Sequence, residues 1–233
     1  MHNSIKEKGV TVKNTKEEMI AKEQRGVLQV SWSEAWTSVI FRRKLIVGST
    51  LFLSVLLYYP HFFAAIQKKQ GLLLNDFVLA SLPSVNLSAT IFSFIYITVI
   101  VGIYRAAQSP YLFLLFLWSS LLISLTRIIT ITLFPLEPPI GLVSLVDPVL
   151  LPFYGPNNIT KDLFYSGHTA SVFLIFLLLR NKKEKIAAFV ATIVVAVCLL
   201  FQHIHYTIDV ISAPFFVWVV FKVAKKIAAV NFD

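Results

Sequence analysis

Residues 110–133 read PYLFLLFLWSSLLISLTRIITITL, and Arg127 is the only charged residue in this run. A helix needs about 20 predominantly apolar residues to cross the roughly 30 Å hydrocarbon core of a bilayer. The Ser109-Pro110 pair at the start of the run is typical of a turn followed by a helix N-terminus. This stretch therefore predicts a transmembrane helix that carries one buried cation.

Five further apolar runs have lengths suited to a membrane span. The stretch 134–161 contains six prolines, so it does not fit a continuous helix and predicts one long, structured loop. We therefore predict an all-α, polytopic membrane protein built as a six-transmembrane-helix bundle. The predicted spans are roughly 45–66, 86–104, 110–133, 162–180, 186–203 and 206–222.

The composition agrees with a membrane protein. Of 233 residues, 57% are hydrophobic and 14% are charged, and the mean hydropathy is +0.75. Soluble domains have about 45–50% apolar and about 25% charged residues. These values exclude a disordered chain, a coiled coil and a secreted disulfide scaffold. The single cysteine, Cys198, has no second cysteine with which to form an intrachain disulfide. It is interpreted as an unreactive side chain packed in the core.

The formal net charge is +9, and the basic residues lie between the apolar runs rather than on one face, which argues against nucleic-acid binding. With the N-terminus inside, 17 of the 21 Lys and Arg residues fall on the cytoplasmic side. The positive-inside rule therefore predicts cytoplasmic termini, with His168 and His205 at the opposite face. The predicted organisation is a cytoplasmic N-terminal segment (1–44), a six-span catalytic membrane domain (45–226) and a short cytoplasmic tail (227–233).

A short helix is expected within the N-terminal segment. Ser31 and Glu34 have the spacing of a capping box, and Trp32 and Trp36 follow at near-helical spacing. Two interpretations stay open: a helix at the membrane interface, or a helix packed on the protein's own surface.

Charged and ionisable side chains are costly within membrane helices, so they are candidates for function. Arg127, His168, and the pair His205 and Asp209 come from three separate segments that are expected to meet at the same end of the bundle. His205 and Asp209 are four residues apart, and on a helix they would share a face. A carboxylate that accepts from one imidazole nitrogen leaves the other nitrogen free to act as a nucleophile.

A second histidine and a guanidinium complete the elements of a metal-free phosphoryl-transfer site. One histidine would act as nucleophile, the other as acid and base, and Arg127 would hold the phosphate. A zinc site is less well supported, because no H-E-x-x-H motif or cysteine ligand is present. His203 is expected to point away from His205, and Glu137 is interpreted as a solvated loop acid or a contact to a cationic head group.

These motifs resemble the last two signature motifs of the sphingomyelin synthase family, a branch of the type-2 phosphatidic acid phosphatase superfamily. The first motif is Ser166-Gly167-His168-Thr169, preceded by Asp162 and Tyr165, and the second is His203-Ile204-His205-Tyr206-Thr207-Ile208-Asp209-Val210. A third similarity is Arg127-Ile128-Ile129-Thr130, followed by Thr132, Leu133, Pro135 and Pro138, with Phe134 as a departure. The resemblance covers roughly residues 120–215.

Departures from the wider superfamily favour the transferase branch. The ordinary lipid phosphatases of the superfamily carry a Lys-x6-Arg-Pro motif and a Ser-Arg pair six residues before the nucleophilic histidine. No Arg-Pro occurs in this chain, and Cys198 and Leu199 stand where the Ser-Arg pair would be. Lys161 also replaces the glycine that usually precedes the motif's acidic residue.

The resemblance implies a lipid phosphotransferase without a cofactor or metal. His205 would attack the phosphorus of a phospholipid head group, Asp209 would orient His205, and His168 would act as acid and base. The partners would be a phospholipid donor and a lipid alcohol acceptor such as ceramide. A phosphatase or phospholipase C-like hydrolase is the alternative, and a non-enzymatic transporter or scaffold is a third class. The substrate-binding residues implied are Arg127, Asp162, Tyr165, Ser166, Gly167 and Tyr206.

Overall fold

A computed structural model describes residues 30–145 and 159–230. Most of the predicted segment 1–44, residues 146–158 of the predicted loop and the end of the predicted tail lie outside this range. The described secondary structure is helical apart from one isolated bridge between Leu72 and Leu136. The helices are α2 (Trp32–Thr37), α3 (Val39–Gln67), α4 (Phe77–Ala80), α5 (Ser88–Ala107), α6 (Pro110–Leu133), α8 (Gly167–Leu178), α9 (Lys182–Phe201) and α10 (Thr207–Ala228).

The chain is a polytopic helical membrane protein, as the sequence predicts. Five of the described helices are long and apolar enough to cross a membrane: α3, α5, α6, α9 and α10. The segment predicted as a span over 162–180 differs, because its helix α8 has only 12 residues. At 1.5 Å per residue such a helix is about 18 Å long. Residues 162–166 are not helical, and Ser166 caps α8 by accepting a hydrogen bond from the Thr169 amide.

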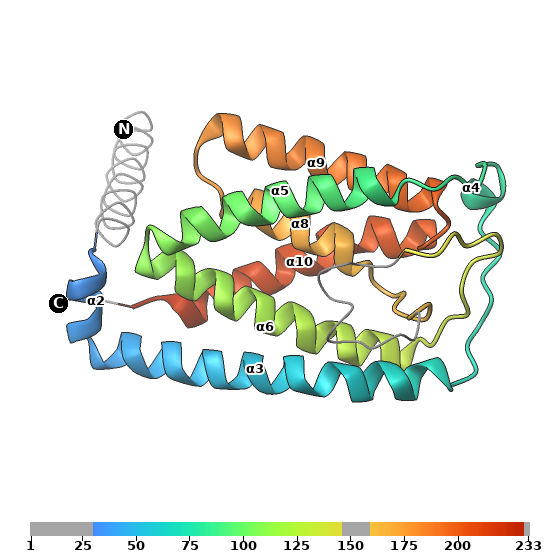
Figure 1. Ribbon diagram of the computed structural model, residues 1–233. Coiled ribbons are helices and arrows are strands. Elements are labelled where there is room, and N and C mark those ends of the chain that lie inside the picture. The colour runs from blue at the N-terminus through green and yellow to red at the C-terminus, as the bar shows by residue number, and fades with distance from the viewer. Residues whose placement is uncertain (1–29, 146–158, 231–233) are drawn as a thin grey trace, which may run out of the picture.

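The short helix α8 lies among the long helices (Figure 1), and it contacts α5, α6, α9 and α10. Small residues allow this close packing. A Cβ added to Gly102 on α5 would lie 2.3 Å from Ile175 Cδ1 on α8, so a larger side chain has no room there. Large apolar side chains on the outer faces are exposed, for example Leu57 on α3 and Ile211 on α10, as expected of surfaces that contact lipid.

Most of the basic residues that the structure describes lie at the end of the bundle opposite His168 and His205. At one end the start of α3, the end of α5, the α8–α9 connection and the end of α10 come together, and the other end holds α4 and the long loops (Figure 1). Lys44 donates to the Ala229 carbonyl (2.6 Å), and Arg105 pairs with Glu184. The helix ends that carry the expected cytoplasmic cations are therefore neighbours in space.

The N-terminal helix predicted after Ser31 is present as α2, and the Ser31 hydroxyl accepts a hydrogen bond from the Glu34 amide. Trp32 from this helix donates its indole N–H to the Ala107 carbonyl (2.8 Å) and packs edge-on against Phe113. These contacts attach α2 to the ends of α5 and α6.

Candidate active site

His205 and Asp209 form a buried pair at the N-terminus of α10. His205 precedes the helix rather than lying within it, yet its Nδ1 is 3.4 Å from Asp209 Oδ2. The same carboxylate oxygen accepts a hydrogen bond from the Tyr206 amide (3.0 Å), which fixes the turn into α10. The exposed fractions of His205 and Asp209 are 1% and 0%. The pairing of Nδ1 leaves Nε2 as the ring nitrogen available for chemistry.

His168 comes from the first turn of α8 and faces His205. The ring centroids of the two histidines are 6.0 Å apart, and Phe92 of α5 lies beside the His168 ring at 6.5 Å. The Ser166 amide donates to the Asp209 carbonyl (3.0 Å), so the start of α8 is hydrogen-bonded directly to the first turn of α10. This separation of the rings allows both histidines to reach one phosphoryl group.

Arg127 of α6 is buried and held from two sides. Its Nε donates to the Tyr165 carbonyl (3.1 Å), and its terminal nitrogen pairs with the Asp162 carboxylate. The guanidinium lies against Gly167, where an added Cβ would be only 2.6 Å from Arg127 Cζ. Gly167 is therefore required by the close approach of Arg127. The structure thus brings Arg127 against Gly167, the residue that precedes His168.

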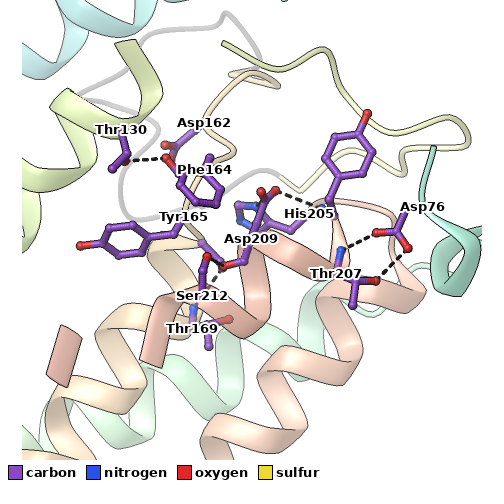
Figure 2. A network of polar contacts seen from close by, with 12 residues as sticks. Asp76, Thr130, Asp162, Phe164, Tyr165, Thr169, His205, Thr207, Asp209 and Ser212 are labelled. Atoms are coloured by element: carbon purple, nitrogen blue, oxygen red, sulfur yellow. Dashed lines mark hydrogen bonds and ion pairs between the residues drawn. The ribbon is translucent and has the colours of Figure 1, made fainter. Parts of the chain in front are cut away.

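Asp209 retains one unsatisfied oxygen. Its Oδ1 is buried and has no hydrogen-bond partner among the residues that the structure describes. A buried carboxylate oxygen without a donor is costly, about 1–3 kcal/mol. Figure 2 shows Asp209 beside His205, with Ser212 and Thr169 close to the turn that follows it. A positive charge formed on His205 would therefore be stabilised by a carboxylate that is poorly solvated.

Three predicted substrate-binding residues have side chains engaged within the protein. The Tyr165 hydroxyl bonds with Thr126 (2.9 Å) and its ring stacks on Phe216, and Ser166 caps α8. The Tyr206 hydroxyl donates to the Glu137 carbonyl (3.0 Å) and accepts from the Leu74 amide (3.3 Å). These side chains build the walls of the site, and direct contact with substrate stays a prediction for them.

Asp162 does not lie on a helix, so the predicted start of a membrane span at residue 162 is wrong. The extended segment before α8 instead brings its carboxylate onto Arg127. The Thr130 hydroxyl holds the same segment by donating to the Phe164 carbonyl (2.8 Å), as Figure 2 shows.

Tyr59 is a site residue that the sequence does not single out. It is buried on α3, and its hydroxyl lies within hydrogen-bonding reach of the Ser124 and Arg127 side chains. It stands in an aromatic-rich run, and its contact with Arg127 joins positions 68 residues apart in the sequence. No local pattern marks such a contact.

Two other polar residues support the outer loops. His203 is not helical, has a φ of 54°, and its ring nitrogens bond to the carbonyls of Ile140 (2.8 Å) and Leu82 (3.2 Å). Its ring therefore bonds to the loops rather than to His205. Glu137 pairs with Lys161 (2.8 Å) and accepts from the Gly71 amide, and the Lys161 ammonium holds the pKa of Glu137 below its ordinary value. It is a paired loop acid and not simply a solvated one.

Asp76 connects the loop after α3 to the start of α10. Its carboxylate accepts from the Thr207 amide (2.6 Å) and hydroxyl (3.0 Å), as Figure 2 shows. It also caps α4 by accepting from the amides of Val78 and Leu79. Burial opposes ionisation, but these hydrogen bonds outweigh it and lower the pKa of Asp76. Asp76 therefore positions the turn that carries His205.

Replacing Asp76 with alanine is expected to destabilise the protein by about 1–2 kcal/mol, because two helix starts lose their acceptor. The thermal unfolding midpoint should fall, while the exposed neighbour variant Asn75→Ala should leave it unchanged. Since the folded-state pKa is lowered, the contribution of Asp76 is present at neutral pH and is lost as the pH falls through that pKa. An identical decline of stability with acid in the wild type and in Asp76→Ala would contradict this assignment.

Comparison with known families singles out the part of the chain that contains the histidines. Residues 161–227 match the family described as PAP2 superfamily C-terminal. The match includes His168, His205 and Asp209, and it supports the type-2 phosphatidic acid phosphatase superfamily. It does not extend to Arg127, and it does not separate the sphingomyelin synthase-like branch from other members. Searches of curated proteins and of solved structures gave no match.

A match to this superfamily fits a lipid phosphatase or phosphotransferase activity. Among the described residues, no group of three or more His, Cys, Asp or Glu side chains is placed to hold a metal ion. The nearest carboxylates are already engaged, Asp209 with His205 and Asp162 with Arg127. We therefore consider how these residues themselves would act on a phosphate ester.

Proposed function

We propose that this chain is a membrane lipid phosphotransferase of the sphingomyelin synthase-like type. It moves phosphocholine or phosphoethanolamine from a phospholipid to a lipid alcohol such as ceramide. The observation that carries the proposal is the closeness of His168 and His205, whose ring centroids are 6.0 Å apart at an interplanar angle of 64°. Asp209 pairs with His205, and Arg127 lies against Gly167, the residue before His168.

In the first step, Nε2 of His205 attacks the phosphorus of the donor lipid and forms an N–P bond. The P–O bond to diacylglycerol breaks, and His168 donates a proton to the departing oxygen. Asp209 stabilises the positive charge on His205, and Arg127 contacts the phosphate oxygens as a planar donor. The products of this step are diacylglycerol and a phosphohistidine that carries the head group.

In the second step, His168 accepts the proton of the acceptor hydroxyl, and the resulting oxygen attacks the phosphorus. The N–P bond breaks and His205 is regenerated. When the acceptor is a lipid alcohol the reaction is a transfer, and when it is water the reaction is a hydrolysis. The hydrolase is the second candidate because the family match fits either outcome.

Asp162 controls how Arg127 meets the substrate. The carboxylate pairs with the guanidinium, and the Tyr165 carbonyl accepts from its Nε. A phosphate would compete with Asp162 for the terminal N–H groups, and the remaining backbone contact would keep the guanidinium plane in place. Arg127 would then pair with the Asp162 carboxylate before substrate binds and with the phosphate afterwards. Its charge is thus neutralised in both states, as a cation in an apolar bundle requires.

The proposed function is tested with membranes that contain the protein. They are incubated with head-group-labelled phosphatidylcholine or phosphatidylethanolamine, with or without ceramide, and the labelled products are identified. Transfer predicts a ceramide-linked head group that appears only when ceramide is present. Release of free phosphocholine at the same rate without ceramide would favour the hydrolase. If neither donor gives a labelled product, both the transferase and the hydrolase assignments are overturned.

Activity is expected to be independent of divalent metal, because the site supplies its own nucleophile and its own cation. Transfer should proceed at an unchanged rate after treatment with EDTA. Turnover that EDTA abolishes and Zn²⁺ or Mg²⁺ restores would exclude the phosphohistidine mechanism in this form.

We further propose that both termini are cytoplasmic and that the site faces the opposite side. The support is the collection of basic helix ends at one end of the bundle, away from His205. In a Cys198→Ala background, a cysteine at exposed Ser81 should react with an impermeant thiol reagent in intact cells. A cysteine at exposed Lys183 should react only after permeabilisation, and the reverse pattern would invert the topology.

A further inference from the structure

Four cations converge at the end of the bundle opposite the candidate active site. They are contributed by the α8–α9 connection, the first turn of α9 and the last turns of α10. Lys222 and Lys225 lie three residues apart near the end of α10, which packs against α8. Arg180 and Lys185 flank the start of α9, and the α8–α9 connection lies at the same end of the bundle as the end of α10 (Figure 1). The charges of Arg180, Lys185 and Lys222 accordingly each act on the Lys225 ammonium. Three of the four side chains are exposed, and Lys185 is half-buried. We call this group, Arg180, Lys185, Lys222 and Lys225, the basic cluster.

No carboxylate neutralises the basic cluster within the part of the chain that the structure describes. The acid nearest in sequence, Glu184, pairs instead with Arg105 of α5. None of the four cations takes part in an ion pair among the described residues. Like charges brought together repel, so the arrangement favours a bound anion.

Aromatic rings hold the lysines of the basic cluster in place. The Lys222 ammonium lies 3.5 Å from the centroid of the Trp218 ring, and Lys225 lies 4.9 Å from that of Phe221. Lys185 lies 5.0 Å from the centroid of Phe176. Cation–π contacts of this kind reduce the freedom of long side chains while they leave their N–H groups able to donate.

The surroundings of the basic cluster are apolar and outward-facing. Trp218, Val219 and Val223 on α10 are 45%, 40% and 45% exposed and lie between or beside the two lysines in sequence. A ligand at this position therefore meets cations at the end of the helix and an apolar surface along it. A soluble anion would use only the first of these features, whereas a phospholipid would use both.

We propose that the basic cluster binds the head group of an anionic phospholipid in the leaflet opposite the candidate active site. The phosphate accepts hydrogen bonds from Arg180 and the lysines, and an acyl chain lies along Val219 and Val223. This site is separate from the donor and acceptor sites of the proposed reaction. It does not depend on whether that reaction is transfer or hydrolysis.

The proposal is tested by thermal unfolding of the full chain in nanodiscs. Phosphatidylcholine discs are compared with discs that also contain phosphatidylglycerol at increasing mole fraction. A lipid that binds the folded state raises the unfolding midpoint. The double variant Lys222→Gln/Lys225→Gln should need a roughly 25-fold higher fraction of phosphatidylglycerol for the same rise, at about fivefold per cation. Its midpoint in phosphatidylcholine alone should match the wild type.

The matched control is Arg42→Gln/Arg43→Gln, which removes the same charge from exposed positions at the same end of the bundle. This control should respond to phosphatidylglycerol like the wild type, and an equal loss in both double variants would overturn a specific site. An equal rise with inorganic phosphate in phosphatidylcholine discs would overturn the lipid as ligand. If Lys222→Gln/Lys225→Gln does not fold, Arg180→Gln is measured in its place, and a wild-type response from it contradicts the proposal.

Discussion

Replacing His205 with alanine is expected to abolish head-group release and head-group transfer together. The variant lacks the nitrogen that forms the N–P bond, so no phosphohistidine accumulates from labelled phospholipid. The loss should be at least about 10⁴-fold, because removal of a nucleophile leaves only the contributions of binding and electrostatics. The measurement is the formation of labelled diacylglycerol and of the labelled acceptor product in the same membranes.

The variant must be compared at equal levels of inserted protein. His61→Ala is a suitable control, because His61 is an exposed histidine of α3. It should transfer the head group at the wild-type rate. The Asp209 carboxylate loses its partner in His205→Ala, so the stability of that variant is measured alongside its activity. Near-normal transfer by a correctly inserted His205→Ala protein would overturn the assignment as a phosphohistidine enzyme.

Replacing His168 with alanine is expected to slow release of diacylglycerol by about 10²–10⁴-fold, the usual contribution of a positioned acid. The attack geometry of His205 depends on Asp209 and on the turn at Tyr206, and it should persist. A substrate analogue that releases nitrophenolate needs no proton on its leaving group. Its first turnover should therefore be much less affected than that of the natural lipid.

The contrast between the two substrates separates acid catalysis from a structural defect. The first turnover is followed by nitrophenolate release, because the second step would also suffer from the absence of a base. His205→Ala should lose activity toward both substrates equally. His168→Ala should lose activity mainly toward the natural lipid. Equal loss of both substrates in His168→Ala would show that its role is not proton donation.

The site illustrates how polar groups are stabilised within an apolar bundle. Arg127 is balanced by Asp162 and receives a further contact from Tyr59, and Asp209 is matched with His205. Removal of one member of such a pair leaves a buried group without its partner, which costs more than the pair contributes. Variants of Asp162 and Tyr59 therefore require a stability measurement before their activity is interpreted.

The helical membrane class could be predicted from the amino-acid sequence, since hydropathy and the required span length are local properties. The boundaries of α6 agree with the predicted range 110–133, and the spacing of Ser31 and Glu34 indicated the start of α2. The polar residues of the candidate site were found because so few polar groups interrupt the apolar runs. Their approximate meeting point followed from the alternating direction of the predicted spans.

Contacts between groups that are distant in the sequence could not be predicted in this way. The contact of Tyr59 with Arg127, the bond of Asp76 to Thr207 and the short length of α8 all depend on how helices pack. The sequence predicted a helix that begins at residue 162, whereas residues 162–166 are not helical. The carbonyls of Phe164 and Tyr165 and the Asp162 carboxylate instead bind groups on α6. Local propensity is a weak preference, and hydrogen bonds between segments in an apolar surrounding outweigh it.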